Sequence, residues 1–302
     1  MHFDVSDLRV FIHVAESPSM TQGARRAHLS PAATSARIKA LETQLGTRLL
    51  YRDSKGVTLT PAGTKLLRHA RLIMRQVEYV KAEFADYGKG MFGHIRIFAN
   101  TTAVTEQLPE VLADFLSRHP AVTVDLQERV SRDIVRGVLD GSADLGLIAG
   151  PVKADGLEVI HSSTDRLLLA LPQGHPLCER ASITLKDTLD FPHVVFHEGS
   201  TLFDFVSAQV EQMGATLPMR IQLSSYESIC RMIEAGVGIG IIPESAAVRH
   251  RRTMRIVTVE LNEPWVVRER SLLVRELDAV PGCVKELIDT LRSRPAVEIE
   301  RR

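Results

Sequence analysis

Residues 21–46 have the pattern of two helices joined by a tight turn. Thr21 is positioned to cap a short helix that ends near Ala27, and the residues HLSP form the turn. Ser30 then caps a second helix with Pro31 at its first position, where the missing N–H of proline costs no hydrogen bond. Gly46 ends that helix. The pattern predicts a helix-turn-helix, preceded by an amphipathic helix over residues 4–17.

The second of these helices has one apolar face and one almost featureless face. At about 100° per residue, the apolar face consists of Thr34, Ile38, Leu41 and Leu45. The opposite face carries small residues, namely Ala32, Ala33, Ala36, Lys39, Ala40 and Thr43, flanked by Ser35 and Arg37. Small side chains let a helix enter the DNA major groove closely, where alanine contacts a thymine methyl. Alanine is also a strong helix former, so an idle surface is the competing interpretation.

Basic residues concentrate in the same part of the chain. Residues 1–89 contain 14 Lys and Arg against 8 Asp and Glu, a net charge of +6, and the remainder carries −6. A hairpin with its turn at DSKG follows the second helix, which is the position of a wing. Arg52 and Lys55 on this hairpin are placed to enter a minor groove, while neighbouring bases neutralise phosphate. Charge alone does not separate a polyanion partner from chance clustering, but the position of these bases around the helix-turn-helix favours double-stranded DNA.

The next helix, which begins at TPAG, carries a heptad pattern over about three repeats. Its apolar positions are Leu66, Ala70, Ile73, Val77, Val80, Phe84 and Tyr87. A single helix cannot bury such a seam, and the neighbouring sequence leaves no apolar partner for it. We therefore expect this helix to form a dimer, with docking on its own domain as the alternative.

The glycine-rich residues 88–94 predict a linker, after which the pattern changes to α/β. Strands such as HIRIFAN, AVTVDLQ and ADLGLIAG alternate with amphipathic helices, and a second set of strands and helices begins at RLLLALP. Two units of roughly 100 residues fit this pattern, with a ligand cleft between them.

Residues 8–63, from LRVFIHVAES to TPAG, resemble the winged helix-turn-helix of the LysR-type transcriptional regulators almost without interruption. The remaining segments match that family in order and size. The resemblance implies a multidomain protein: an all-α winged helix-turn-helix over 1–60, a dimerising linker helix over 61–88 and a hinge over 89–93. A two-lobed α/β domain, similar to type 2 periplasmic binding proteins, would occupy 94–302, with lobe one at 94–163 and 269–302 and lobe two at 164–268.

The same resemblance implies the partners. The helix from Pro31 would bind the major groove, the wing the minor groove, and a small-molecule effector would bind between the lobes. The regulator would be a homodimer, commonly paired into a homotetramer, with RNA polymerase as a further candidate partner.

DNA-binding roles are carried over to individual positions of this chain. They are Thr21, Ser30, Pro31, Ala32, Ala33, Ser35, Arg37, Lys39, Arg52 and Lys55. Family members commonly carry a Gln or Arg on the base-facing side of the recognition helix, where this chain has Pro31 and Ala36. The resemblance therefore predicts a site that depends more on Ser35, Arg37, the wing and DNA shape.

Candidate effector-binding residues follow the strand ends. Asn100, Thr101 and Thr102 lie at a helix N-terminus, where free N–H groups and hydroxyls suit a carboxylate, although ordinary capping explains them too. In LysR-type proteins this loop lines the effector pocket. The same arrangement recurs in lobe two with Phe196, Ser200 and Thr201. Weaker candidates are Tyr226, Ser131, Ile148 and Ala149.

Three other classes of protein compete with this interpretation. An enzyme is disfavoured because the chain lacks HExxH, GxSxG and P-loop motifs, so we expect no catalysis, cofactor or metal. A secreted solute-binding protein is disfavoured by the basic N-terminal helices and the missing signal peptide. A thiol-based redox regulator remains as the alternative, although the spacing of Cys178, Cys230 and Cys283 does not suggest the pair used by the peroxide-sensing branch. These widely spaced cysteines form no CxxC motif and fit a reducing cytosol. The sequence also contains no apolar run of the length that a membrane helix needs.

Overall fold

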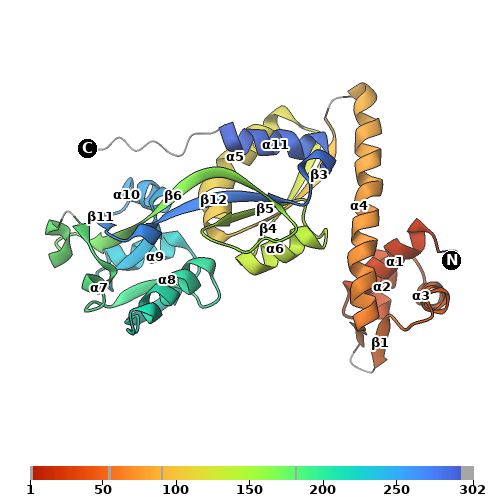
Figure 1. Ribbon diagram of the computed structural model, residues 1–302, viewed down its shortest axis with the longest axis horizontal. Helices are drawn as coiled ribbons and strands as arrows, with labels where there is room; N and C mark the ends of the chain where they lie inside the picture. The colour runs from red at the N-terminus through yellow and green to blue at the C-terminus, as the bar shows by residue number, and fades with distance from the viewer. Residues whose placement is uncertain (1–2, 54–55, 90, 181, 294–302) are drawn as a thin grey trace. The chain divides into compact units, whose positions relative to one another are not determined.

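The computed structural model describes residues 3–53, 56–89, 91–180 and 182–293, and the side chains of 82–89 lie outside that description. The chain divides into two compact units, Met1–Phe92 together with Leu139–Ser142, and Gly93–Val138 together with Ala143–Arg302. Figure 1 shows the elements of each unit. We describe each unit by itself.

The first unit is a winged helix-turn-helix followed by a long helix. Its elements are α1 (Val5–Ala15), α2 (Met20–Arg26), α3 (Pro31–Leu45), β1 (Leu50–Asp53), β2 (Gly56–Leu59) and α4 (Pro61–Lys89). The core joins the inner faces of α1, α3 and α4 through Leu8, Phe11, Ile38, Leu41 and Leu67. This confirms the apolar face expected for the helix from Pro31, since Thr34, Ile38 and Leu41 are buried.

The helix ends follow the capping rules, with one correction. Ser30 Oγ accepts the Ala33 N–H at 3.2 Å, and Gly46 ends α3 with φ of 66°. The prediction that Thr21 caps the shorter helix is wrong. Ser19 caps α2 by accepting the Gln22 N–H at 3.3 Å, and Thr21 lies inside the helix. Both Ser and Thr are good caps, so the sequence alone did not distinguish Ser19 from Thr21.

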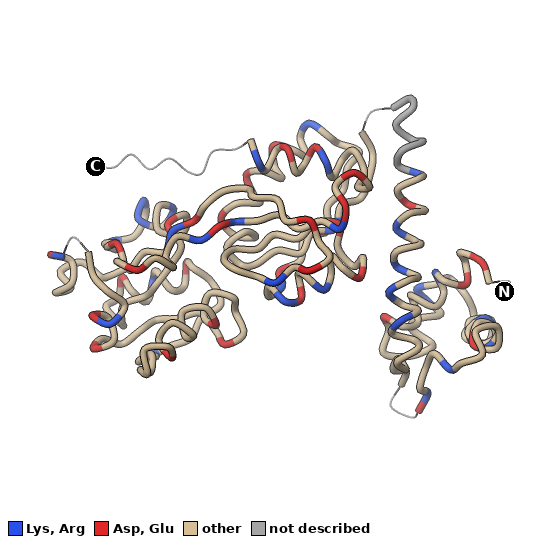
Figure 2. The backbone as a smooth tube through the Cα atoms, viewed as in Figure 1, with Lys and Arg blue, Asp and Glu red and all other residues tan. Residues whose placement is uncertain are grey.

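The wing and the long helix have the expected form. β1 and β2 pair antiparallel from Leu50↔Leu59 to Asp53↔Gly56, and Thr60 Oγ1 accepts the Gly63 N–H at the start of α4. Lys and Arg recur along α4, shown in blue in Figure 2. The predicted linker over 88–94 is too long, because α4 continues to Lys89 and the first strand of the second unit begins at Gly93.

The first lobe of the second unit, lobe one, is a sheet in the order β4-β3-β5-β12-β6 with helices on both faces (Figure 1). β3 is parallel to β4 and β5, whereas β12 is antiparallel to β5 and β6. The elements are β3 (Gly93–Ala99), η1 (Ala103–Gln107), α5 (Leu108–Arg118), β4 (Val122–Glu128), α6 (Ser131–Leu139), β5 (Leu145–Ala149), β12 (Val267–Val274) and α11 (Gly282–Ser293). Here η1 is a π-helical turn.

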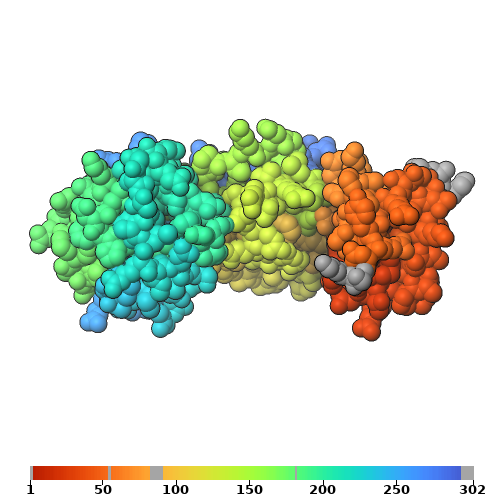
Figure 3. Space-filling view, turned by 90° about the horizontal axis from the view of Figure 1, so that it is seen from below, coloured from red at the N-terminus to blue at the C-terminus, as the bar shows by residue number. Residues whose placement is uncertain are grey.

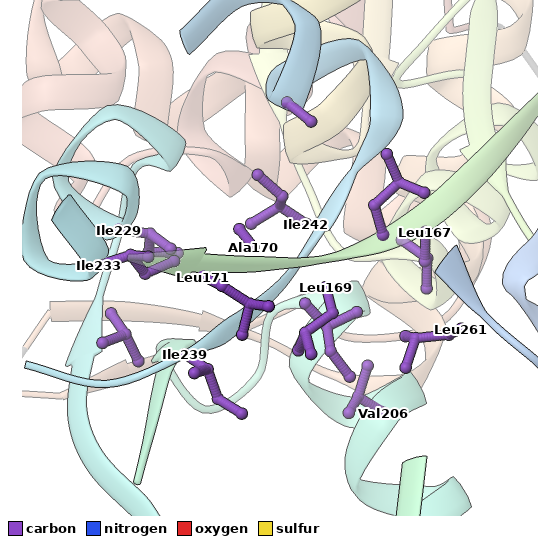
Figure 4. Close-up of a cluster of buried hydrophobic side chains, with 14 of the residues drawn as sticks. Leu167, Leu169, Ala170, Leu171, Val206, Ile229, Ile233, Ile239, Ile242 and Leu261 are labelled. Atoms are coloured by element: carbon purple, nitrogen blue, oxygen red, sulfur yellow. The ribbon is translucent and has the colours of Figure 1, made fainter. Parts of the chain in front are cut away.

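Lobe two is built on the second half of β6. Its elements are β7 (Ser182–Ile183), α7 (Leu185–Thr188), β8 (His193–Phe196), α8 (Thr201–Gln212), β9 (Met219–Leu223), α9 (Tyr226–Glu234), β10 (Gly240–Pro243), α10 (Glu244–Arg251) and β11 (Ile256–Leu261). Figure 4 shows Leu167, Leu169 and Leu171 of β6 packed among Val206 and Ile229 of the covering helices. The 15-residue β6 (Glu158–Pro172) therefore contributes to both lobes.

The strand β6 changes partners where the lobes meet. Its residues up to Arg166 pair with β12, and from Leu167 onward it pairs with β10 and β11. β12 begins at Val267, opposite Arg166. The strand β6 thus runs through the junction between the lobes, and β12 begins at it. Figure 3 shows the two lobes as yellow-green and blue-green masses side by side. The sequence pattern predicted only the RLLLALP end of β6 and did not predict α10 or β11.

Candidate functional site

The outer face of α3 is open to solvent in the first unit. Ala32, Ala33, Ala36, Lys39 and Ala40 are all exposed, as the helical wheel predicts. Pro31 is exposed at the first position of the helix, next to the capping Ser30. The face carries few hydrogen-bonding groups. It is therefore suited to close apolar contact with the bases of a major groove and not to bidentate hydrogen bonds with them.

Two arginines predicted to bind DNA have partners within the protein. Arg37 Nη1 lies 2.6 Å from Asp7 Oδ1 of α1, which ties the two helices together. Arg52 on the wing donates from Nη1 to Ser35 Oγ at 3.1 Å, and its Nη2 lies 3.4 Å from Glu42 Oε2. Both arginine side chains remain more than a third exposed, so their outer edges are available to phosphate.

The remaining candidates on this face are simpler. Thr21 on α2 is exposed, as are Arg25 and Arg26 at the end of the same helix. Lys55 lies outside the described residues. Exposed basic side chains therefore lie on α2, on α3 and on the wing, the elements that also carry the alanine face and its neighbour Ser35, and this combination suits a polyanion.

The predicted seam on α4 divides into two parts. Leu66 and Ala70 pack on the core of their own domain, and Ala70 is fully buried. Ile73 and Val80 are 42% and 52% exposed, and Val77 is half-buried. The side chains of Phe84 and Tyr87 lie outside the described residues. An exposed apolar stripe on a helix is typical of an interface with another chain.

A cleft between the two lobes of the second unit brings together most of the predicted effector residues. It encloses roughly 240 Å³ of atom-free space, part of it open to solvent. Its lining residues are Asn100, Thr101, Thr102, Phe196, Ser200, Thr201, Leu202, Tyr226 and Arg268. Seven of these nine were predicted from the sequence; Leu202 and Arg268 were not.

Hydroxyl groups bridge the lobes across this cleft. The oxygens of Thr102 and Tyr226 lie 2.8 Å apart, and both residues are buried. Burial raises the pKa of Tyr226, with the hydrogen bond to Thr102 opposing the shift, so the phenol keeps its proton at neutral pH. The Tyr226 ring also packs edge-on against Phe196 at 4.6 Å between centroids.

Three predicted residues lie beside the cleft and do not line it. Ser131, at the start of α6, reaches across to Thr201 with 3.4 Å between the two hydroxyl oxygens. Ile148 and Ala149 end β5 and are buried, Ile148 in the core of lobe one. Of the residues that do line the cleft, Asn100 and Ser200 also serve as caps, for the Ala103 and Phe203 N–H groups respectively.

Arg268 is the charged group of the cleft. Its side chain is 2% exposed, and its Nη2 lies 2.9 Å from Oδ2 of Asp165. Oδ1 of the same Asp165 lies 3.0 Å from Arg270 Nη2, so one carboxylate serves two guanidinium groups. The sequence did not predict this cluster, because Asp165 and Arg268 are 103 residues apart in the chain and no local pattern links them.

A second charged contact joins the lobes beyond the cleft. Arg249 on α10 donates to Glu106 Oε2 at 2.9 Å and to Glu110 Oε1 at 2.7 Å. The Glu106 side chain is 3% exposed and lies on the π-helical turn that follows Thr102. π-helical turns are frequent at functional sites.

The three cysteines do not form a reactive pair. Cys178, Cys230 and Cys283 form no disulfide within the described structure and lie in η2 (Pro176–Glu179), α9 and α11. Burial raises the pKa of the Cys230 thiol to about 12, with the charge of Glu106 adding to the shift. A thiol held protonated in this way is a poor nucleophile, which counts against the redox interpretation.

The described residues contain no cluster of His, Cys, Asp or Glu suited to a metal ion. Among the described helices, none combines the length and the apolar character needed to span a bilayer.

Comparison with protein families gives two matches that together cover most of the chain. Residues 5–64 match the bacterial regulatory helix-turn-helix protein, lysR family. Residues 88–296 match the LysR substrate binding domain. The second match alone spans more than half of the chain.

Individual relatives match over nearly their full length. The uncharacterized HTH-type transcriptional regulator YnfL of Escherichia coli (strain K12) is 28% identical over 274 residues, which cover 88% of this chain and 92% of YnfL. Full-length OxyR from Pseudomonas aeruginosa, solved as a cysteine-to-aspartate variant, superposes with a TM-score of 0.76 at 22% identity, covering 97% of this chain and 98% of OxyR. CbnR in complex with its target DNA gives a TM-score of 0.65 at 24% identity, covering 96% and 99%. At these identities the two structures establish a shared fold.

Proposed function

This chain belongs to the LysR family of DNA-binding transcriptional regulators, and on that premise we propose that α3 and the wing bind operator DNA under the control of a small molecule in the cleft between the lobes. The observation that carries the proposal is the convergence of hydroxyls, an aromatic pair and a buried arginine in one cleft at the lobe junction. Such a cleft has the composition of a ligand site.

The DNA-binding part of the proposal rests on the alanine face of α3. Side chains as small as Ala32, Ala33 and Ala36 allow the helix to lie deep in a major groove, while Lys39 and Arg52 reach phosphate. The related fold of CbnR was solved in complex with its target DNA, which supports a nucleic-acid partner for this fold.

The effector part rests on the geometry of the lobes. Thr102, on lobe one, and Tyr226, on lobe two, meet across the cleft, so a ligand that contacts both would favour one relative position of the lobes. A ligand shifts a conformational equilibrium only by its differential affinity for the two states. Contacts with residues on both lobes would provide this difference in affinity, because both contacts form only in one relative position of the lobes. The hydroxyls and the α8 N-terminus favour a carboxylate.

Assembly and location complete the proposal. The exposed Ile73 and Val80 on α4 support a homodimer, and dimers would pair into a homotetramer. Bound to a promoter, the protein would act on RNA polymerase. It would work in the cytoplasm, where the DNA lies.

The test uses the full-length protein and a DNA site selected from a random-sequence pool. We expect selection of a defined site, and loss of binding in Ala36→Asp, because a carboxylate on this face would oppose the DNA charge. Ala121→Asp, at an exposed position between α5 and β4 in the second unit, is the matched control for the added charge. Equal loss in both variants, or binding without sequence preference, would refute the DNA-binding assignment of α3.

A further inference from the structure

The unpaired Nε–H of Arg268 is the most informative feature of the cleft. Its Nη2 is bound to Asp165, whereas the buried Nε has no hydrogen-bond partner within the described structure. Burying an unpaired donor of a charged group is costly, so native proteins rarely leave one without a role. Because Arg268 also lines the cleft, its Nε–H is available to a group that enters there.

The charges around Arg268 do not balance within the crossing strands. Arg268 and Arg270 share the single carboxylate of Asp165, and the Asp165 side chain is 2% exposed. Arg249, at the other contact between the lobes, pairs with both Glu106 and Glu110, so that group carries no positive charge in excess. The trio of Arg268, Arg270 and Asp165 by itself carries one positive charge in excess, and an anion at Arg268 would compensate it.

The opposite wall of the cleft adds to the same preference. Ser200 caps the 12-residue helix α8, and Thr201 is its first residue, so the positive end of this helix lines the cleft. Phe196 and Leu202 make the wall apolar beside it. The group that fits is a small organic molecule with one anionic end and an apolar body.

From these observations, and resting on the proposed function, we infer that Arg268 is the residue that sets effector specificity and that the effector is an organic oxyanion, most simply a carboxylate. The guanidinium binds the carboxylate through its Nε–H, and Asp165, which is itself paired with Arg270, holds the guanidinium in position.

The experiment compares carboxylates with their own neutral amides on the full-length protein. Acetate, pyruvate and benzoate are each titrated beside acetamide, pyruvamide and benzamide at constant ionic strength, with the thermal midpoint as the readout. We expect at least one carboxylate to bind about tenfold or more tightly than its amide. That preference is lost in Arg268→Gln and partly retained in Arg268→Lys, which keeps the charge without the bidentate geometry. Arg166→Gln, on the neighbouring position of β6 and outside the cleft lining, is the matched control.

A second measurement does not depend on finding the ligand or on the stability of the Arg268 variants. Thr201→Asp puts a carboxylate at the cleft wall, and Thr201→Asn is its uncharged counterpart. We expect Thr201→Asp to raise the thermal midpoint relative to Thr201→Asn. In the background of Arg268→Gln, most of the gain disappears, which separates pairing with Arg268 from the general benefit of an acid at a helix N-terminus.

The outcomes separate the two proposals. Equal binding of carboxylates and amides overturns the anion assignment and leaves an effector cleft in place. Binding of neutral compounds alone does the same. The absence of any shift, together with equal midpoints for Thr201→Asp and Thr201→Asn, overturns the role of Arg268. DNA binding measured in the same samples reports separately on the regulator itself.

Discussion

The phenol oxygen of Tyr226 lies 2.8 Å from the hydroxyl oxygen of Thr102, and these residues, 124 positions apart, come from different lobes. Both are almost fully buried, Tyr226 at 2% and Thr102 at 4% exposure. The cleft is therefore closed on one side by a hydrogen bond that exists only when the lobes are together.

Tyr226→Phe removes one partner of this bond and leaves the Thr102 hydroxyl unsatisfied. We expect a loss of about 1 kcal/mol in the free energy of unfolding. Urea denaturation of Tyr226→Phe, Thr102→Val and the double variant measures the coupling. Strictly additive losses would mean that the two hydroxyls do not interact in solution.

Arg249→Met should cost more than the loss of an ordinary surface ion pair. It leaves the carboxylate of Glu106, with a 3% exposed side chain, without its cation. Because Arg249 itself is partly exposed, we expect about 2 kcal/mol, below the range for a fully buried pair. Arg231→Met is the control, since the Arg231–Glu227 pair is exposed on both sides and is worth about 0.5 kcal/mol at most. Similar losses in the two variants would show that Glu106 is solvated.

Arg52→Ala should weaken DNA binding and lower its dependence on salt. Arg52 is held toward α3 by Ser35 and Glu42, which places its positive charge beside the alanine face. Loss of one phosphate contact reduces the slope of log K against log salt by about 1. Fluorescence anisotropy over a salt series measures it, with Arg118→Ala on α5 as the control. An unchanged slope removes Arg52 from the interface.

Ile73→Glu combined with Val80→Glu should give monomers. Both side chains lie exposed on α4, and a charge at either position would be buried in a helix pair. Sedimentation velocity distinguishes the species, and Gln76→Glu controls for added charge at an already polar, exposed position. Persistence of the dimer in the double variant would place the interface on another surface.

His193 should make the protein less stable in mild acid. Burial lowers the pKa of His193 to about 4, against the hydrogen bond to the Phe191 carbonyl, from 6.5 in the unfolded chain. Between these values the unfolded state binds more protons, so stability falls as pH drops from 6.5 toward 4. The expected contribution is about 2 kcal/mol lost between pH 7 and pH 5. In His193→Gln that part of the loss should vanish in urea titrations at the two pH values, and an identical loss would exclude His193 as the source.

Much of the first unit could be predicted from local rules. Ser30, Pro31 and Gly46 mark the ends of α3 by capping chemistry that acts within four residues, and the period of its apolar residues gives the buried face. The error at Thr21 has the same origin, because two acceptable caps lie two residues apart. Ala70 shows the limit of the heptad rule, because it occupies a heptad position but is buried in the core of its own domain and is not available to another chain.

The sequence alone determined most of the order of helices and strands, with α10 and β11 missed, as well as the featureless face of α3 and most of the cleft lining, because helix caps and strand ends lie at positions that local spacing reveals. Only the tertiary structure decided the role of Arg268. On β12 the apolar Val267 is exposed and the charged Arg268 is buried, the reverse of what alternation predicts for a strand with one face in water. The reason is that β12 pairs with β6 at the lobe junction and brings Asp165 against Arg268, so a pair distant in sequence makes the burial of charge tolerable.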